Sequence, residues 1–256
     1  MSAVPSPHAA PKALLFDVNE TLISLQPLAD AMVQVGLKAD LLELWFAKVL
    51  RDGIAGAAAG SLASFKDIGV YHTKLLLAAA KPAVNDHTEA AETVLAAFNR
   101  VDLYDDVAPA LAEIRACNMK VATMTNGSVD ITKGALQKGR LDPYVHVNKM
   151  MDVTQAGTWK PHAKCYHFAA QQLGLEPSEV MLVAVHPWDC NGAMQAGLQA
   201  AYLDRNSIPF PPFFTQPTLT STSMSDLVDQ LQHMQRSSKK RGPDDADPYK
   251  SLDWVK

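Results

Sequence analysis

The sequence is poor in cysteine, has no long apolar run and shows no excess of basic residues. Its three cysteines are scattered and odd in number, which argues against a disulfide framework and favours a reducing, cytoplasmic location. No apolar run approaches the roughly 20 residues of a membrane-spanning helix, and the first residues lack the features of a secretory signal. With a net charge of −4, we expect neither nucleic acid nor membrane as a partner.

What is present suits a globular α/β protein. The chain has 256 residues, of which 48% are hydrophobic. Residues 12–18 form a short unbroken apolar run, which is typical of a parallel strand buried on both faces. Further strands are predicted at 120–126, 146–153, 179–185 and 199–204.

Helical patterns alternate with these strands. They cover residues 106–118, 128–139, 160–174, 188–197 and 223–234. Ser128 is the expected N-cap of the second helix and Gly139 its end, while the third should have Pro161 at its first position and Gly174 after its last. This alternation predicts a Rossmann-like core, a parallel sheet with helices on both faces.

The segment between residues 26 and 100 breaks this alternation. No strand is predicted there, and four of five positions in one helical stripe are apolar: Leu41, Leu44, Trp45, Lys48 and Val49. Two more helices are expected, at 61–80 and 86–101. We therefore predict a core of residues 11–25 and 101–235, an inserted helical domain at 26–100, and a disordered polar tail at 236–256.

Polar residues follow the strands of the predicted sheet. They are Asp17, Asn19 and Thr21 after the first strand, Thr125, Asn126 and Gly127 after the second, Lys160 just before the helix that starts at Pro161, and His186, Trp188 and Asp189 after the strand at 179–185. Because ligands bind beyond the carboxyl ends of parallel strands, we expect these side chains to converge on one crevice.

The chemistry of this set is consistent with nucleophilic catalysis. A carboxylate such as Asp17 can form a covalent ester or acyl phosphate that water later hydrolyses. Lys160 would keep that carboxylate ionised and neutralise an anionic substrate. Backbone N–H groups near Gly127 can hold a carboxylate or a phosphate. Asp189 could position the lysine, orient water or bind a metal.

Four stretches of the sequence resemble the motifs of a known superfamily. "FDVNETL", "MTNGS", "WKPHAKCY" and "VHPWDCNGA" are similar, in order, to the four motifs of the haloacid dehalogenase (HAD) superfamily, over roughly residues 12–205. The helical insert resembles the cap domain of that superfamily. Within it, the chain is most similar to type II 2-haloacid dehalogenases, in the D-x-x-x-T pattern at Asp17, the spacing of Lys160 and Tyr166, and the Trp188-Asp189 pair.

The resemblance implies a hydrolase of small anionic 2-haloacids. Asp17 would attack C2 of the acid and displace halide, Thr21 would hold Asp17, and Tyr166 or Asp189 would hold Lys160. The hydroxyl of Thr125 would bind the substrate carboxylate, and Asn126 would cradle the halide. Halide leaves without protonation, so the resemblance implies no metal or other cofactor, and it implies a homodimer.

Three positions depart from the dehalogenase pattern. Phe46 stands where the family has the arginine that meets the halide, and Ala184 and His186 stand where it has a serine and an asparagine that orient water. His186 could replace the asparagine as a hydrogen-bond partner or act as a general base. Phe46 and Trp188 are candidates for the substrate pocket or for packing between cap and core.

Two alternatives remain open from the sequence. One is a magnesium-dependent phosphatase with Asp17, Asn19 and Asp189 around the metal. In such phosphatases a second aspartate protonates the leaving alcohol, and Asn19 cannot donate that proton. The other alternative is a binding protein that has kept the scaffold without catalysis.

Overall fold

The fold is taken from a computed structural model that describes residues 9–81, 86–141, 144–145 and 149–240. Its centre is a parallel six-stranded sheet in the order β3-β2-β1-β4-β5-β6. The strands are β1 (Ala13–Phe16), β2 (Lys120–Thr125), β3 (Met150–Asp152), β4 (Val180–Ala184), β5 (Gln199–Leu203) and β6 (Leu219–Ser221). The Rossmann-like core predicted from the alternating pattern is confirmed.

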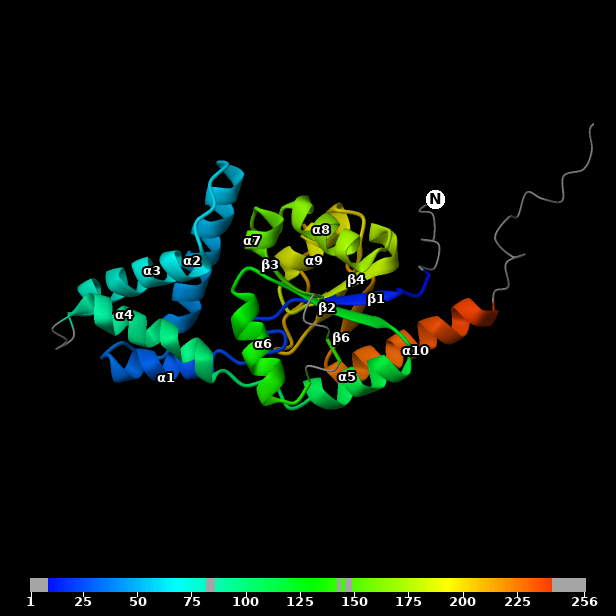
Figure 1. Cartoon of the computed structure of the whole chain (residues 1–256), viewed down its shortest axis with the longest axis horizontal. Helices are drawn as coiled ribbons and strands as arrows, with labels where there is room; N and C mark the ends of the chain where they lie inside the picture. Colours follow the sequence, from blue (N-terminus) through cyan, green and yellow to red (C-terminus); the bar gives the residue numbers. More distant parts are fainter. Residues whose placement is uncertain (1–8, 82–85, 142–143, 146–148, 241–256) are drawn as a thin grey trace, which may run out of the picture.

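The unbroken apolar run of β1 follows from its central place in the sheet. Leu15 pairs with Ala122 on one side and with Leu182 on the other, and all three side chains are fully buried. Helices cover both faces of such a sheet, so no strand face is left for polar side chains. Figure 1 shows α8 and α9 on one face and α5 and α10 on the other.

The helices of the core agree in place with the predicted ones. They are α5 (Val107–Ala116), α6 (Val129–Lys138), α8 (Ala163–Leu173), α9 (Pro187–Gln195) and α10 (Met224–Lys240). Three short elements of the core, β6, α7 (Val153–Ala156) and the 3-10 helix η3 (Pro177–Glu179), were not predicted, because three or four residues are too few to show a period. Residues 146–148 of the strand expected at 146–153 lie outside the described residues.

Helix ends test the predicted capping residues. Ser128 accepts a hydrogen bond from the backbone N–H of Asp130, and Gly174 ends α8 in the left-handed region with φ 64°, so both predictions are confirmed. Gly139 also ends its helix, with ordinary right-handed geometry. The prediction that Pro161 is the first residue of α8 was wrong, because the helix begins two residues later, at Ala163. His162 is the N-cap, and its ring Nδ1 accepts a hydrogen bond from the backbone N–H of Lys164.

The inserted segment forms a helical block at one end of the molecule (Figure 1). It consists of α1 (Gln26–Gln34), α2 (Leu41–Ala58), α3 (Phe65–Ala80), α4 (His87–Ala96) and the short 3-10 helix η1 (Ala97–Arg100). The predicted stripe of α2 was partly wrong. Trp45 and Val49 are buried, but Leu44 is 46% exposed and Phe46 is buried in its place, because α2 buries a second face toward the core.

Two chain segments connect the helical block to the core, and they pair with each other. Ile23 forms an antiparallel bridge with Leu103, the N–H of Ser24 donates to the carbonyl of Asp102, and the N–H of Tyr104 donates to the carbonyl of Leu22. This pairing lies a few residues after Asp17. The helical block is therefore anchored next to the carboxyl edge of the sheet.

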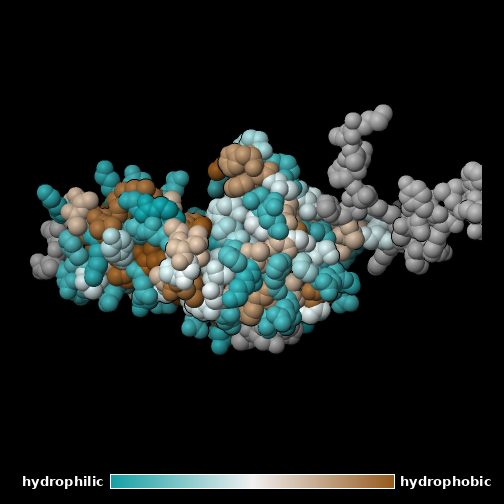
Figure 2. Space-filling view, turned by 90° about the horizontal axis from the view of Figure 1, so that it is seen from above, coloured by the Kyte–Doolittle hydropathy of each residue, from teal (hydrophilic) through white to brown (hydrophobic). Residues whose placement is uncertain are grey.

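The C-terminal helix corrects the predicted tail. Helix α10 continues to Lys240, so the disordered tail does not begin at residue 236 as predicted. Residues 241–256 lie outside the described part of the chain. None of the helices that the structure describes combines the length and the apolar character needed to cross a membrane. Figure 2 shows apolar and polar side chains interspersed over the helical block.

Candidate active site

Asp17 directly follows β1 at the carboxyl edge of the sheet. Its side chain is 6% exposed, and both of its oxygens have partners. Lys160 Nζ lies 2.7 Å from Oδ1, while the hydroxyl of Thr21 donates to Oδ2 at 2.9 Å. Thr21 in turn accepts the N–H of Val185 at 3.1 Å, which ties the loop after β1 to the end of β4. The carboxylate is thus held in one orientation.

Lys160 lies between two carboxylates. Its Nζ is 2.6 Å from Asp189 Oδ2 as well as 2.7 Å from Asp17, and Lys160 and Asp189 are fully buried. The hydroxyl of Tyr166 donates to Asp189 Oδ1 at 2.6 Å. Of the two partners expected for Lys160, Asp189 makes the contact, and Tyr166 acts through Asp189.

The charges of this cluster set its protonation states. Burial would raise the pKa of Asp17, but Lys160 and His186 hold it well below its usual range. Burial would lower the pKa of Lys160, but the two carboxylates keep it above its ordinary value. Burial raises the pKa of Asp189. The positive charge of Lys160 lowers it and the negative charge of Asp17 raises it, and the net result is a raised pKa. Asp17 is therefore an ionised carboxylate beside a charged lysine.

His186 contacts two carboxylates. Its Nδ1 lies 3.0 Å from Asp17 Oδ2, and its Nε2 lies 2.9 Å from Glu20 Oε2. Burial would lower the pKa of His186, but hydrogen bonds and charge from Asp17 and Glu20 raise it to about 9. The imidazole is therefore protonated at neutral pH in the free protein. A general base there must first lose this proton.

Aromatic rings enclose the imidazole. The ring of Trp188 stacks on His186 at 5.3 Å between centroids, and the ring of Phe46 lies 5.9 Å from it on a tilt of 34°. Phe46 reaches this place from α2 of the helical block, while Trp188 comes from α9 of the core. Phe46 and Trp188 thus face His186 from the helical block and from the core, respectively.

The turn after β2 lies beside this cluster. Thr125 accepts the N–H of Gly127 at 2.9 Å, and Asn126 accepts the backbone N–H of Lys160 at 2.9 Å. Asn126 thereby connects the turn to the backbone of the buried lysine. The loops that the sequence places at separate strand ends do meet at one edge of the sheet.

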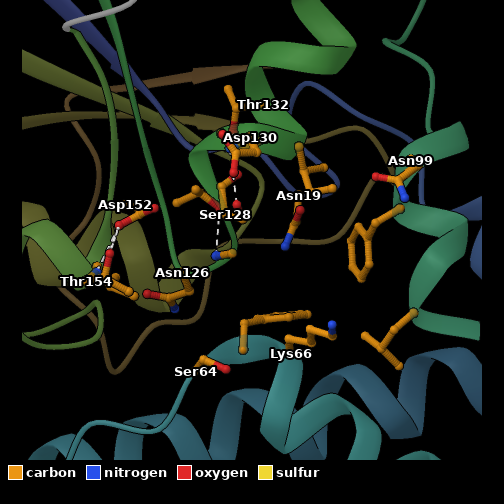
Figure 3. Close-up of a pocket in the computed structure, with 18 of the residues that line it drawn as sticks. Asn19, Ser64, Lys66, Asn99, Asn126, Ser128, Asp130, Thr132, Asp152 and Thr154 are labelled. Carbon is orange, nitrogen blue, oxygen red and sulfur yellow. Dashed lines mark hydrogen bonds between the residues drawn. The ribbon is translucent and has the colours of Figure 1, made fainter. Parts of the chain in front are cut away.

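A cavity of about 760 Å³ opens beside the cluster, between core and helical block. Its core wall includes Asn19, Thr125, Asn126 and Gly127, and its other wall comes from α3, α4 and η1. Figure 3 shows Asn19 and Lys66 directed into it from opposite sides. Asp17 is not among its lining residues, but the next two residues of the chain, Val18 and Asn19, are.

The residues named for a magnesium site do not fit the ion as they are arranged. Both oxygens of Asp17 are bonded to Lys160, Thr21 or His186, and both oxygens of Asp189 are bonded to Lys160 or Tyr166. The lysine ammonium lies between the two carboxylates, where it repels a cation. Among the residues with described positions, no group of three His, Cys, Asp or Glu side chains suits a metal.

Glu20 was missed by the sequence analysis. It has φ 62°, in the left-handed region that a non-glycine residue rarely adopts, and this conformation accompanies its contact with His186. Its charge is unremarkable in a loop, and nothing in the sequence indicates its backbone conformation. Only its place three residues after Asp17 could have drawn attention to it.

These features define a hydrolase site on a Rossmann-like core with a helical insert. The family model of haloacid dehalogenase-like hydrolases matches residues 11–197, and the chain belongs to this family. The sequence is 25% identical over 222 residues to "(S)-2-haloacid dehalogenase 1" of Pseudomonas sp. (strain CBS-3), which covers 86% of this chain and 96% of that protein. It is also 28% identical over 207 residues to "Glyceraldehyde 3-phosphate phosphatase" of Methanopyrus kandleri, covering 76% of this chain and 84% of that one.

A solved structure supports the same fold. The L-2-haloacid dehalogenase from Xanthobacter autotrophicus, with chloropropionic acid covalently bound, superimposes with a TM-score of 0.78 at 23% identity and covers 88% of this chain and 99% of that one. The chain is therefore a HAD-superfamily hydrolase close to 2-haloacid dehalogenases.

Proposed function

We propose that this hydrolase removes halide from a small 2-haloacid through a covalent ester of Asp17, without a metal. The observation that carries the proposal is the state of Asp17: an ionised carboxylate, fixed by Thr21 and paired with Lys160, with an amide rather than an acid at residue 19. A carboxylate held in this way is a nucleophile. The proposed specificity for 2-haloacids is supported by the similarity of the sequence to an (S)-2-haloacid dehalogenase.

In the first step, an oxygen of Asp17 attacks C2 of the acid. The new C–O bond forms as the C–halogen bond breaks, and the halide leaves with the bonding electrons. No proton is needed, so Asn19 in place of an acid is no obstacle. Lys160 balances the charge of the cluster, and the turn at Thr125–Gly127 receives the substrate carboxylate through its hydroxyl and N–H groups.

In the second step, water attacks the carbonyl carbon of the ester. The bond between this carbon and the alkoxy oxygen then breaks, which gives the 2-hydroxy acid and returns Asp17 to a carboxylate that contains the water oxygen. His186, whose Nδ1 lies 3.0 Å from Asp17, first releases its own proton to solvent and then accepts a proton of this water. It returns a proton to the alkoxy oxygen as that bond breaks, and the second proton of the water is lost when Asp17 becomes a carboxylate again. Glu20, on the other ring nitrogen, would stabilise the imidazolium that results.

The phosphatase alternative has less support from the same residues. It requires a general acid where Asn19 stands and a magnesium site where Lys160 bridges Asp17 and Asp189. A binding protein without catalysis would have no use for the buried pair of Asp17 and Lys160, because taking two charges out of water costs free energy even when they are paired.

The test is a paired assay of purified protein against 2-haloacids and phosphate esters, with EDTA or with Mg²⁺. We expect halide release that survives EDTA and is lost in Asp17→Asn. A single turnover in H₂¹⁸O should place the label in the peptide that contains Asp17 and not in the product. Phosphate release that requires Mg²⁺ would refute the proposal in favour of the phosphatase.

A further inference from the structure

The cavity beside Asp17 is much larger than a small 2-haloacid. Its volume is about 760 Å³. A three-carbon 2-haloacid has six non-hydrogen atoms, which fill less than about 200 Å³ at the roughly 30 Å³ that liquid water allots to each molecule. More than half of the cavity would remain empty around such a substrate.

The remaining space has apolar walls. The side chains that form them come from α3, α4, η1, α6 and α7: Phe65, Leu95, Phe98, Ile131 and Val153. The two phenylalanines meet edge to face at 5.7 Å between centroids, and Phe65 also stacks on Trp159 at 6.0 Å. These packed rings give the cavity a fixed apolar surface.

Polar side chains also line the cavity, on the side of the core and on the side of the helical block. Asn19, which is buried, and the turn after β2 lie on the side of the core. Lys66 and Asn99 are exposed side chains of the helical block, on the opposite side of the cavity from Asn126 and Ser128 (Figure 3). A ligand anchored at the turn therefore has an apolar surface to cover before it reaches the solvent.

The charges around the cavity disfavour a second anionic group on the ligand. Lys66 is the lining cation among the described residues, whereas Glu92, Asp130 and Asp152 bring three carboxylates. Asp152 accepts hydrogen bonds from the backbone N–H groups of Thr154 and Val129, but the other two have no such partner in the described part of the chain. These carboxylates favour a ligand whose far end carries no charge.

We propose that the substrate is a 2-haloacid with an unbranched alkyl side chain of several carbons, which occupies this apolar cavity. The inference rests on the proposed function. The carboxylate and C2 lie at the turn after β2 and at Asp17. The alkyl chain runs between Phe65, Phe98 and Ile131 toward the opening near Lys66.

The experiment is a series of 2-bromo acids of increasing length, from propanoate to octanoate. Each added methylene that enters the cavity should raise kcat/KM about three- to fourfold, until the chain reaches solvent. A flat or falling series would overturn the inference, and so would a preference for a 2-bromo dicarboxylate over the alkyl acid of equal length.

Variants with larger side chains in the cavity test whether the alkyl chain of the substrate binds there. Ile131→Trp narrows it from α6, and Ala96→Phe narrows it from α4 on the exposed side. We expect both to remove the gain for long acids and to lower kcat/KM far more for 2-bromooctanoate than for 2-bromopropanoate. Ile208→Trp is the matched control, since Ile208 is exposed and does not line the cavity. Equal losses at every chain length would overturn the inference.

The binding of acids without halogen tests the alkyl site independently of the proposed reaction. Alkanoic acids without halogen, from propanoate to octanoate, should raise the Tm increasingly with length, and both filling variants should abolish the increase. If no 2-haloacid releases halide but this binding pattern holds, the proposed reaction fails and the alkyl site stands. If short acids turn over without any length dependence in turnover or binding, the reaction stands and the alkyl site fails.

Discussion

The sharpest prediction concerns His186 and separates the two steps of the proposed reaction. The imidazole is placed to accept the proton of the attacking water, which is needed only after the ester has formed. His186→Ala should therefore slow ester hydrolysis about 100- to 10,000-fold, the usual range for loss of a general base, or about 3–5 kcal/mol in barrier height. Ester formation should change by less than about threefold, because Lys160 and Thr21 still hold Asp17.

The assay is a rapid-quench experiment with enzyme in excess of a 2-bromo acid. Halide release reports ester formation, 2-hydroxy acid reports hydrolysis, and the intact mass of the protein reports the ester itself. The variant should release close to one halide per molecule of acid and accumulate the ester. His233→Ala, on the exposed surface of α10, is the matched control.

The pH dependence supplies a second reading of the same step. In the free protein the pKa of His186 is about 9, because Asp17 and Glu20 both favour the proton. Ester formation neutralises Asp17 and leaves Glu20, so the hydrolysis rate should rise with pH around a midpoint between 6.5 and about 9. Equal slowing of both steps in His186→Ala, or no ester under any condition, would refute the role of His186 as the base.

Three further predictions concern the cluster and the assembly. The pKa of His186 rises from 6.5 to about 9 on folding, so its contribution to stability is complete below pH 6.5 and is lost as the pH rises through about 9. The free energy of unfolding is measured in urea for the protein and for His186→Gln. The difference between the two should fall by about 3 kcal/mol across that pH range. Tyr166→Phe removes the hydroxyl that donates to the buried Asp189 and should cost about 1–3 kcal/mol in the same assay; an unchanged midpoint would show that the bond is not stabilising. We also propose a homodimer, in line with the exposed apolar side chains of Tyr71 and Leu75 on α3; sedimentation equilibrium should give twice 27.7 kDa, and Leu75→Glu should shift it toward the monomer.

The place of the candidate site could be predicted from the sequence because the carboxyl ends of parallel strands lie at the same edge of the sheet. Asp17 and Lys160 are 143 positions apart, yet each lies in a loop at the carboxyl end of the sheet, and the structure joins them at 2.7 Å. The rule that polar residues after buried strands converge needs no knowledge of side-chain orientation. This is why Asp17, Lys160, Asp189 and His186 could all be assigned to one place.

Contacts that depend on backbone conformation or helix rotation could not be obtained in this way. Glu20 reaches His186 from a left-handed backbone conformation that glycine or asparagine would usually mark. On α2, Leu44 and Phe46 are both apolar, and only packing against α3 and the core decides that Phe46 is buried and Leu44 exposed. The partner of Lys160 was left open between Tyr166 and Asp189 for the same reason, since these two side chains lie next to each other.

The charge balance of the buried cluster links the two proposed steps. In the free protein, the cations of Lys160 and His186 face three carboxylates, those of Asp17, Asp189 and Glu20. Ester formation removes the charge of Asp17, which is one of the two carboxylates that raise the pKa of His186. His186 then keeps the contact with the partly exposed Glu20 and can release its proton, whereas Lys160 keeps its contact with the fully buried Asp189. The first step thus converts the imidazole from an acid that stabilises Asp17 into the base that the second step requires.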